Sequence, residues 1–294
     1  MCVNLEAIAK KYHDQAEKLK RRIILCGGTG CVANGAMKVR NRLVERLNAI
    51  GEKTVVEIGG DDGRNCDDAT LVSKSGCQGF CQQGPLVLIL PDEIVYTKVN
   101  PDDVDEIIEK TIQGGQIIDR LLYVNPVSGK HCRGDHDTDF TSRQTRVVLK
   151  NRRIEPDSIS EYIAMGGYEG ARKAVATMTP ADVCEELVKS GLRGRGGAGF
   201  PTGLKWKFTL ASQNAKKYVI CNGDEGDPGA FMDRSVMEGN PHAVIEGMMI
   251  AARAIGADEG YVYVRAEYPL AVHRMRNAVH DAEKSGVLGD KLFG

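Results

Sequence analysis

The chain of 294 residues carries 39 basic and 40 acidic side chains, a formal net charge of −1, and 5% aromatic residues. This length accommodates two domains, and a near-neutral chain with few aromatic rings lacks the basic, stacking surface that binds nucleic acid, so no nucleic-acid partner is expected. No apolar run approaches the roughly 20 residues that span a bilayer, which argues against direct membrane insertion.

An amphipathic helix over residues 4–20 is predicted first, followed by a mixture of strands and helices. The strands are predicted at 23–25, 54–58, 86–90 and 93–99, and the helices at 37–50 and 101–113. The second helix begins at Asn100-Pro101 and has acidic residues at its positive end. This order is that of a thioredoxin-like fold, so a first domain is predicted over residues 1–122.

Residues 123–157 are polar and irregular, which indicates a linker into a second domain over 158–294. The predicted helices of that domain are 158–176, 181–189, 241–255 and 269–284, and its strands are 217–221 and 261–265. Alternating strands and helices with short connections indicate an α/β layer with a parallel sheet. The whole chain is therefore expected to be α/β.

Four of the nine cysteines form two pairs, Cys26 with Cys31 (CGGTGC) and Cys77 with Cys81 (CQGFC). Each pair follows an apolar strand and lies in a glycine-bearing loop, where backbone N–H groups can donate to sulfur. Four thiolates suit either zinc or a [2Fe–2S] cluster, and ordinary buried thiols are a third interpretation.

The cysteine count also bears on location. Nine cysteines are an odd number and too sparse for a disulfide scaffold. The polar start of the chain has no apolar core of the signal-peptide type. Together these features predict a cytoplasmic protein.

The run from Gly191 to Phe208, GLRGRGGAGFPTGLKWKF, holds six glycines together with two arginines and two lysines. Glycines this dense are unsuited to a helix or strand interior. They allow main-chain N–H groups to surround an anion, and the basic side chains supply matching charge. A phosphate-binding loop is predicted, although neither the dinucleotide fingerprint after a strand nor the P-loop pattern is present.

A second polar segment, Asn222–Phe231, follows the predicted strand 217–221 directly. It carries three carboxylates, on Asp224, Glu225 and Asp227. Ligands bind at the carboxyl ends of parallel strands in α/β folds, so these side chains are predicted to line a ligand crevice. The alternative is that Asp and Asn serve only to form turns.

CGGTGC and CQGFC resemble the ligand motifs of thioredoxin-like [2Fe–2S] ferredoxins. The glycine run and NGDEGDPGAFMDR resemble the NADH-binding flavoprotein subunit of respiratory complex I and its relatives in NAD(P)-linked hydrogenases, including the electron-bifurcating [FeFe] type, and in formate dehydrogenases. The resemblance implies a [2Fe–2S] ferredoxin domain fused ahead of a Rossmann-like FMN/NADH-binding domain. It implies cofactors FMN, NAD(H) and [2Fe–2S].

Carried over by position, the resemblance assigns roles to individual residues. It makes the four paired cysteines the cluster ligands and places FMN on the glycine run, with Lys205 on the phosphate and with Asn222 and Asp224 on the ribityl chain or ring edge. It puts Glu225 and Asp227 on the nicotinamide side and stacks Phe200 and Phe208 on the adenine. The implied cofactor-binding residues of the glycine run are Gly194, Arg195, Gly196, Gly197, Gly199, Phe200, Lys205 and Phe208.

The implied activity is that of a diaphorase, in which NADH gives a hydride to FMN and single electrons pass to iron–sulfur clusters of a hydrogenase, formate dehydrogenase or complex I-like assembly. No side-chain catalyst is expected. The relatives continue beyond residue 294 with segments that complete the flavin site and bind a [4Fe–4S] cluster. The chain therefore resembles a truncated form with an incomplete FMN/NADH-binding domain, and the resemblance does not imply activity of this part on its own. The alternative is a flavin-free [2Fe–2S] relay or assembly fragment.

Overall fold

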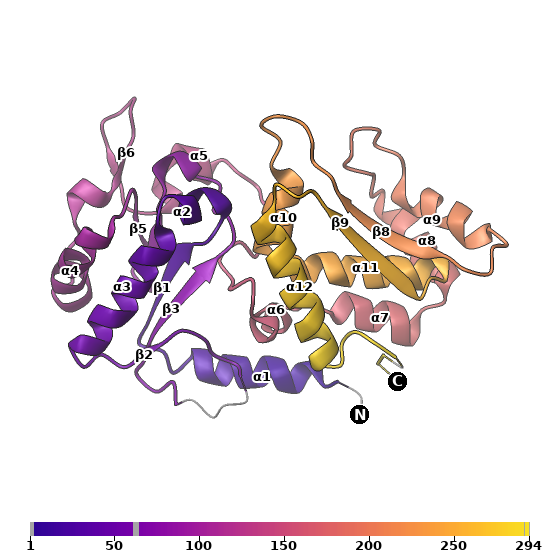
Figure 1. Ribbon diagram of the computed structural model, residues 1–294, viewed down its shortest axis with the longest axis horizontal. Coiled ribbons are helices and arrows are strands. Elements are labelled where there is room, and N and C mark those ends of the chain that lie inside the picture. Colours follow the sequence, from indigo (N-terminus) through magenta and orange to yellow (C-terminus); the bar gives the residue numbers. More distant parts are fainter. Residues whose placement is uncertain (1–2, 61–64, 291, 294) are drawn as a thin grey trace. The chain divides into compact units, whose positions relative to one another are not determined.

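The computed structural model describes residues 3–60, 65–290 and 292–293. The chain divides into two compact units, coloured indigo to magenta and salmon to yellow in Figure 1. The N-terminal unit comprises Ala7–Ala164 together with Glu238–Asn240, and the C-terminal unit comprises Met165–Met237 and Pro241–Gly294 together with Met1–Glu6. None of the helices in the described ranges combines the length and apolarity that a bilayer crossing requires.

A five-stranded mixed sheet forms the centre of the N-terminal unit, in the order β2-β3-β1-β4-β5. Its strands are β1 Arg21–Cys26, β2 Thr54–Val55, β3 Thr70–Ser75, β4 Val87–Leu90 and β5 Ile94–Tyr96. The central strand β1 pairs in parallel with β3 and antiparallel with β4. Its last four residues are buried, so the strand that delivers Cys26 is held on both sides and on both faces.

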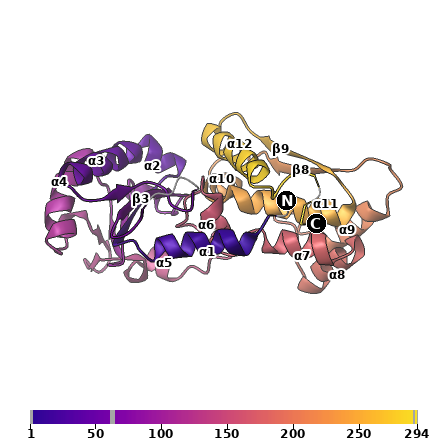
Figure 2. The same cartoon turned by 90° about the horizontal axis from the view of Figure 1, so that it is seen from below.

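Helices cover both faces of this sheet, with α3 above it and α1 below it in Figure 2. The α-helices of the unit are α1 Leu5–Ala16, α2 Thr29–Ala33, α3 Ala36–Ala49, α4 Val104–Glu106, α5 Asp139–Ser142 and α6 Ile159–Ala164. Val39, Leu43 and Leu47 of α3 enter the main core with the apolar residues of β1 and β4. Tyr12 of α1 packs on the other face. This arrangement matches the thioredoxin-like order predicted from the sequence.

One predicted strand of this unit differs in the structure, and one strand was not predicted. The strand predicted at 54–58 is paired only over β2, Thr54–Val55, and the main partner of β1 is β3, Thr70–Ser75, which the sequence analysis missed. The sequence TLVSKS does not read as a buried strand because Ser73 and Ser75 interrupt the apolar run. Both serines are nevertheless buried, and the hydroxyl of Ser75 donates to the carbonyl of Leu25 across the ladder. Tertiary hydrogen bonds thus satisfy them.

The polar segment 123–157 belongs to the same compact unit as the sheet. It contains the short hairpin β6 Tyr123–Val124 and β7 His131–Cys132. Asp135 forms ion pairs with Arg152 and Arg153, and Arg153 also pairs with Glu93 beside β5. Burial on its own raises the pKa of Asp135, but the hydrogen bonds and charges of the two arginines outweigh this effect and hold its pKa below the usual range.

The C-terminal unit is built on two parallel strands, β8 Tyr218–Gly223 and β9 Glu259–Val264. Its helices are α7 Glu169–Thr177, α8 Pro180–Ser190, α9 Thr202–Ala211, α10 Met232–Gly239, whose last two residues group with the other unit, α11 Pro241–Ile255 and α12 Pro269–Lys284. The helix α11 packs against the sheet and against α7, α8 and α12 (Figure 1). Its Ala254 and Ile255 share a core with Val183 and Cys184 of α8.

The predicted helix 269–284 is confirmed as α12, whereas two other predictions for this unit need correction. The helix predicted over 158–176 is broken into α6 and α7, because Gly166 and Tyr168 both adopt left-handed backbone conformations with φ of 85° and 63°. The last part of the glycine run is helical and not irregular, because α9 begins at Thr202 and includes Gly203. A Cβ on Gly203 would lie 2.6 Å from the backbone nitrogen of Val188, so this glycine permits close packing of α9 on α8.

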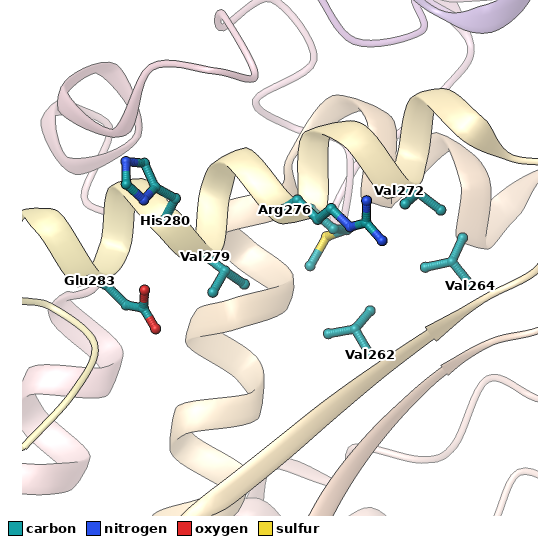
Figure 3. A pocket seen from close by; sticks show the side chains of 8 residues that line it. Val262, Val264, Val272, Arg276, Val279, His280 and Glu283 are labelled. Carbon is teal, nitrogen blue, oxygen red and sulfur yellow. The ribbon is translucent and has the colours of Figure 1, made fainter.

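A groove of about 560 Å³ lies between β9 and α12. Figure 3 shows Val262 and Val264 of β9 opposite α12. Val272, Arg276 and Val279 line the groove from that helix. On the other face of the two-stranded sheet, large side chains are exposed. They are Tyr218, Ile220, Tyr261 and Tyr263.

Candidate cofactor sites

The two cysteine pairs lie at the ends of neighbouring parallel strands. Cys26 is the last residue of β1, and Cys31 lies in the short helix α2 that follows. Cys77 comes just after β3, which ends at Ser75, the register partner of Cys26. Because β1 and β3 are parallel and adjacent, their carboxyl ends bring the two cysteine loops together.

Contacts between the sulfur atoms link all four thiols. The sulfurs of Cys77 and Cys81 lie 3.6 Å apart, and Cys31 and Cys77 both lie close enough to Cys26 to influence the pKa of its thiol. The hydrogen bond between the first pair raises the pKa of Cys26 to about 12 and lowers the pKa of Cys31. Of these two, Cys31 is therefore the thiol that ionises first.

The loop glycines leave room for the sulfurs and supply donors to them. A Cβ on Gly28 would lie 2.7 Å from the Cβ of Cys77, and a Cβ on Gly84 would lie 2.5 Å from the sulfur of Cys31. The backbone N–H of Gly79 donates to the sulfur of Cys77 at 3.4 Å. Glycine is thus required where the two loops approach each other.

These observations fit a [2Fe–2S] cluster. Nowhere in the described part of the chain do three or more His, Cys, Asp or Glu side chains surround one point closely enough to form a single-ion site. A [2Fe–2S] cluster has a different requirement, because four thiolates are divided between two irons. Two thiols in contact within each loop, and a contact between the loops, meet that requirement with the donor atoms such clusters use.

The glycine run forms a closed, exposed loop in front of α9. The backbone N–H of Gly194 donates to the carbonyl of Phe200 at 2.8 Å, and Arg193 and Pro201 form an isolated bridge that closes the loop. Gly197 has a φ of 105°, in the left-handed region that favours glycine. A Cβ on Gly196 would meet no atom within 4 Å. The open face of this loop, followed by a helix N-terminus, fits a phosphate.

Two lysines that lie two residues apart on α9 differ in their surroundings. Lys207 pairs with Glu185, whereas Lys205 is exposed and forms no ion pair among the residues that the structure describes. Phe200 and Phe208 are both exposed, at 47% and 66%, with ring centroids 6.4 Å apart. The loop and the start of α9 therefore present Arg195 and Lys205, neither of which forms an ion pair among the described residues, and two aromatic surfaces to solvent.

The acidic segment follows β8 as predicted, and its side chains divide into two groups. Asn222, Asp224 and Asp227 are exposed, and the side-chain oxygen of Asn222 accepts a hydrogen bond from the backbone N–H of Asp224 at 2.9 Å. Glu225 is buried, with 7% of its surface exposed. Its carboxylate accepts hydrogen bonds from the backbone N–H groups of Asp233 and Arg234 in the first turn of α10.

Glu225 thus has a structural function that sequence reasoning did not anticipate, since it satisfies the free N–H groups at the start of a helix. Its own backbone carbonyl accepts hydrogen bonds from the guanidinium of Arg265 and the hydroxyl of Tyr268. Arg265 was also missed. The signal was present, because Arg265 follows β9 directly, and the carboxyl ends of β8 and β9 are in register at Gly223 and Val264.

The N-terminal sheet with its paired cysteines is compatible with a thioredoxin-like iron–sulfur domain, and the glycine loop with the acidic segment is compatible with a flavin-binding α/β domain. Residues 3–112 match the thioredoxin-like [2Fe–2S] ferredoxins, and residues 187–291 match the Nuo51 FMN-binding domain. The predicted fold class, family and cofactors FMN and [2Fe–2S] are thereby confirmed.

Curated relatives show both similarity and a difference in length. The chain is 54% identical over 158 residues to the NADP-reducing hydrogenase subunit HndC of Solidesulfovibrio fructosivorans, covering 53% of this chain and 32% of that protein. It is 31% identical over 294 residues to the NAD-reducing hydrogenase HoxS subunit alpha of Cupriavidus necator, covering 99% of this chain and 45% of that protein. The chain therefore spans less than half the length of these relatives.

A solved NAD⁺-reducing [NiFe]-hydrogenase in its air-oxidised state aligns with 97% of this chain and 44% of its own chain, at 25% identity and a TM-score of 0.42. That score is too low to support a comparison of the folds.

Proposed function

We propose that the chain is the NADH-oxidising module of a diaphorase-type flavoprotein subunit. The observation that carries this proposal is the presence in one chain of a converged four-cysteine site and an open glycine loop with an unpaired lysine. When bound, FMN accepts a hydride from NADH and a [2Fe–2S] cluster accepts electrons singly. A chain that holds both cofactors can take two electrons from one donor molecule and pass them on one at a time.

In this proposal the residues of the chain bind and orient the cofactors. Cys26, Cys31, Cys77 and Cys81 are the proposed cluster ligands. Backbone N–H groups of the glycine loop, Arg195 and Lys205 are proposed to hold the FMN phosphate, because this loop combines open donors with unpaired charge.

The acidic segment and the exposed rings complete the proposed site. Asn222 and Asp224 are exposed where they can accept hydrogen bonds from the flavin, and Phe200 and Phe208 offer faces on which an adenine stacks. Of the two acids expected beside the nicotinamide, Asp227 is exposed and Glu225 is engaged at α10. We assign the direct contact to Asp227 and an indirect, loop-holding function to Glu225.

The proposed partners are the other subunits of a hydrogenase, formate dehydrogenase or complex I-like assembly. Curated relatives are named as subunits of hydrogenases and of NADH-quinone oxidoreductase, and formate dehydrogenase rests on the sequence resemblance alone. We place the protein in the cytoplasm because thiolates that ligate iron need a reducing compartment. We also propose cofactor domains over 1–122 and 158–294 with residues 123–157 between them.

The test is to measure iron, acid-labile sulfide and acid-released flavin per chain on anaerobically purified protein, with NADH-dependent reduction of an artificial one-electron dye. We expect about two irons per chain, and one FMN bound after reconstitution with excess flavin. A Lys205→Ala variant with full flavin occupancy would remove the phosphate assignment.

The same measurements separate the alternatives. Two irons without flavin at any FMN concentration would favour a [2Fe–2S] relay or assembly module. Zinc in place of iron, with no visible absorption, would refute the electron-transfer proposal as a whole.

A further inference from the structure

A buried carboxylate contacts the start of the helix that carries Cys31. Glu238 groups with the N-terminal unit and has 1% of its surface exposed. One carboxylate oxygen accepts a hydrogen bond from the backbone N–H of Thr29 at 3.0 Å, and the other accepts one from the Thr29 hydroxyl at 2.5 Å. Thr29 is the first residue of α2, in the middle of the CGGTGC motif.

The residue after Glu238 contacts the other cysteine loop. A Cβ on Gly76 would lie only 2.3 Å from the Cα of Gly239, so the two backbones are packed without space for a side chain. Gly76 immediately precedes Cys77, and its carbonyl accepts a hydrogen bond from the thiol of Cys26 at 3.7 Å. The dipeptide Glu238-Gly239 therefore contacts both loops of the proposed cluster site.

We propose that Glu238 is a positioning residue for the cluster, which fixes the start of α2 and thereby Cys31, and which places a carboxylate beside the thiolates. This inference rests on the proposed cluster function. A charge held in a poorly solvated environment is felt more strongly than one in water, and the potential of an iron–sulfur centre depends on nearby charge and hydrogen bonds. Negative charge opposes the arrival of an electron, so Glu238 keeps the cluster potential low.

A merely structural carboxylate gives a different result. If Glu238 served only to satisfy the free N–H groups of α2, a neutral side chain with the same shape would replace it without changing the cluster potential. Gln fits this description, because its oxygen can accept from the Thr29 N–H while its amide donates to the Thr29 hydroxyl oxygen. The variant Glu238→Gln therefore removes charge and retains the contact geometry.

Glu52 provides the matched control. It is also partly buried and hydrogen-bonded, to Lys20 and Thr70, at the start of β1 and β3. At about 3.3 Å per strand residue it lies about 16 Å from the end of β1 that carries Cys26. Glu52→Gln removes the same charge at the opposite end of the sheet.

The experiment is an EPR-monitored redox titration of the whole chain, with iron content measured on the same samples. We expect Glu238→Gln to retain iron and to shift the midpoint potential in the positive direction, Glu238→Asp to stay close to the wild type, and Glu52→Gln to show no shift. An iron-loaded Glu238→Gln chain with the wild-type potential, or an equal shift in Glu52→Gln, would overturn the inference.

If Glu238→Gln fails to hold iron, Thr29→Val is the second test of the positioning function. This variant keeps the carboxylate of Glu238 and removes the hydroxyl that donates a hydrogen bond to it. We then expect a shift in the negative direction or a reduced iron content, and wild-type values for both would refute the positioning function. A wild-type chain that binds no iron is a separate outcome, which would refute the proposed function and the inference with it.

Discussion

The glycines of CGGTGC allow a sharp test of how closely the cysteine loops approach. Gly28 and Gly30 are two residues apart in one motif, and neither has a left-handed backbone. A Cβ at position 28 would lie 2.7 Å from the Cβ and 2.9 Å from the Cα of Cys77, whereas a Cβ at position 30 would lie 3.6 Å from the Cβ of Cys81. The second distance is an ordinary contact and the first is a clash.

The size of the effect follows from these distances. Carbon atoms in contact are separated by about 3.5–4.0 Å, so Gly28→Ala must push the two loops about 1 Å apart. Overpacking of this kind costs about 1–3 kcal/mol. Metal–ligand bonds tolerate deviations of only about 0.2 Å. We therefore expect Gly28→Ala to lose most of its iron, and Gly30→Ala, which adds a methyl group inside α2, to keep it.

Iron and acid-labile sulfide per chain, the visible circular dichroism spectrum and the thermal midpoint of both variants are the measurements. The reasoning is refuted if Gly28→Ala holds iron and shows the wild-type spectrum, or if Gly30→Ala loses as much iron as Gly28→Ala. A lower thermal midpoint in Gly28→Ala alone, with full iron, would mean that the loops move apart without disturbing the ligands.

Three further predictions concern other parts of the chain. Lys205→Ala is expected to weaken FMN binding about tenfold or more, the value of a charge-assisted hydrogen bond, while Lys207→Ala leaves it unchanged; a fluorescence titration that finds equal effects would contradict this. Cys77→Ser should abolish the iron signal yet leave the C-terminal unit folded by protease resistance, and joint loss of both would speak against separate domains. Asp135→Asn should lower the thermal midpoint by a constant amount above about pH 5, because the depressed pKa of Asp135 beside Arg152 stabilises the fold only while the carboxylate is charged. That difference should shrink below about pH 4, and a difference independent of pH would rule out the ion pair as its source.

The sequence predicted those elements whose local pattern agrees with their environment. The helix over Pro269–Lys284 has its proline at the first turn and an uninterrupted helical period, and the first cysteine pair follows the apolar run Ile23–Leu25. Elements that depend on distant partners were missed. The strand β3 contains buried serines whose hydroxyl groups find hydrogen-bond partners on the neighbouring strand β1. The helix α9 contains Gly203, which is needed because a side chain there would clash with Val188.

The candidate site divides in the same way. The acidic segment was predicted at the end of a strand and follows β8 in the structure, whereas the cofactor contacts of that segment and of the glycine loop stay predictions. The burial of Glu225 was not foreseen, because its hydrogen bonds go to backbone groups eight and nine residues further along the chain. Glu238 could not be recognised at all, since its partner Thr29 lies 209 residues away.

The two-stranded sheet of the C-terminal unit bears on how the protein behaves in solution. In the part of the chain that the structure describes, β8 and β9 pair only with each other, so each has one edge with unsatisfied backbone donors and acceptors. One face of this ribbon also exposes Tyr218, Ile220 and Tyr261. Such edges template strand addition between molecules, and two strands alone are marginally stable. Residues 1–294 produced alone are therefore expected to self-associate as concentration rises, with β-rich oligomers growing from this ribbon.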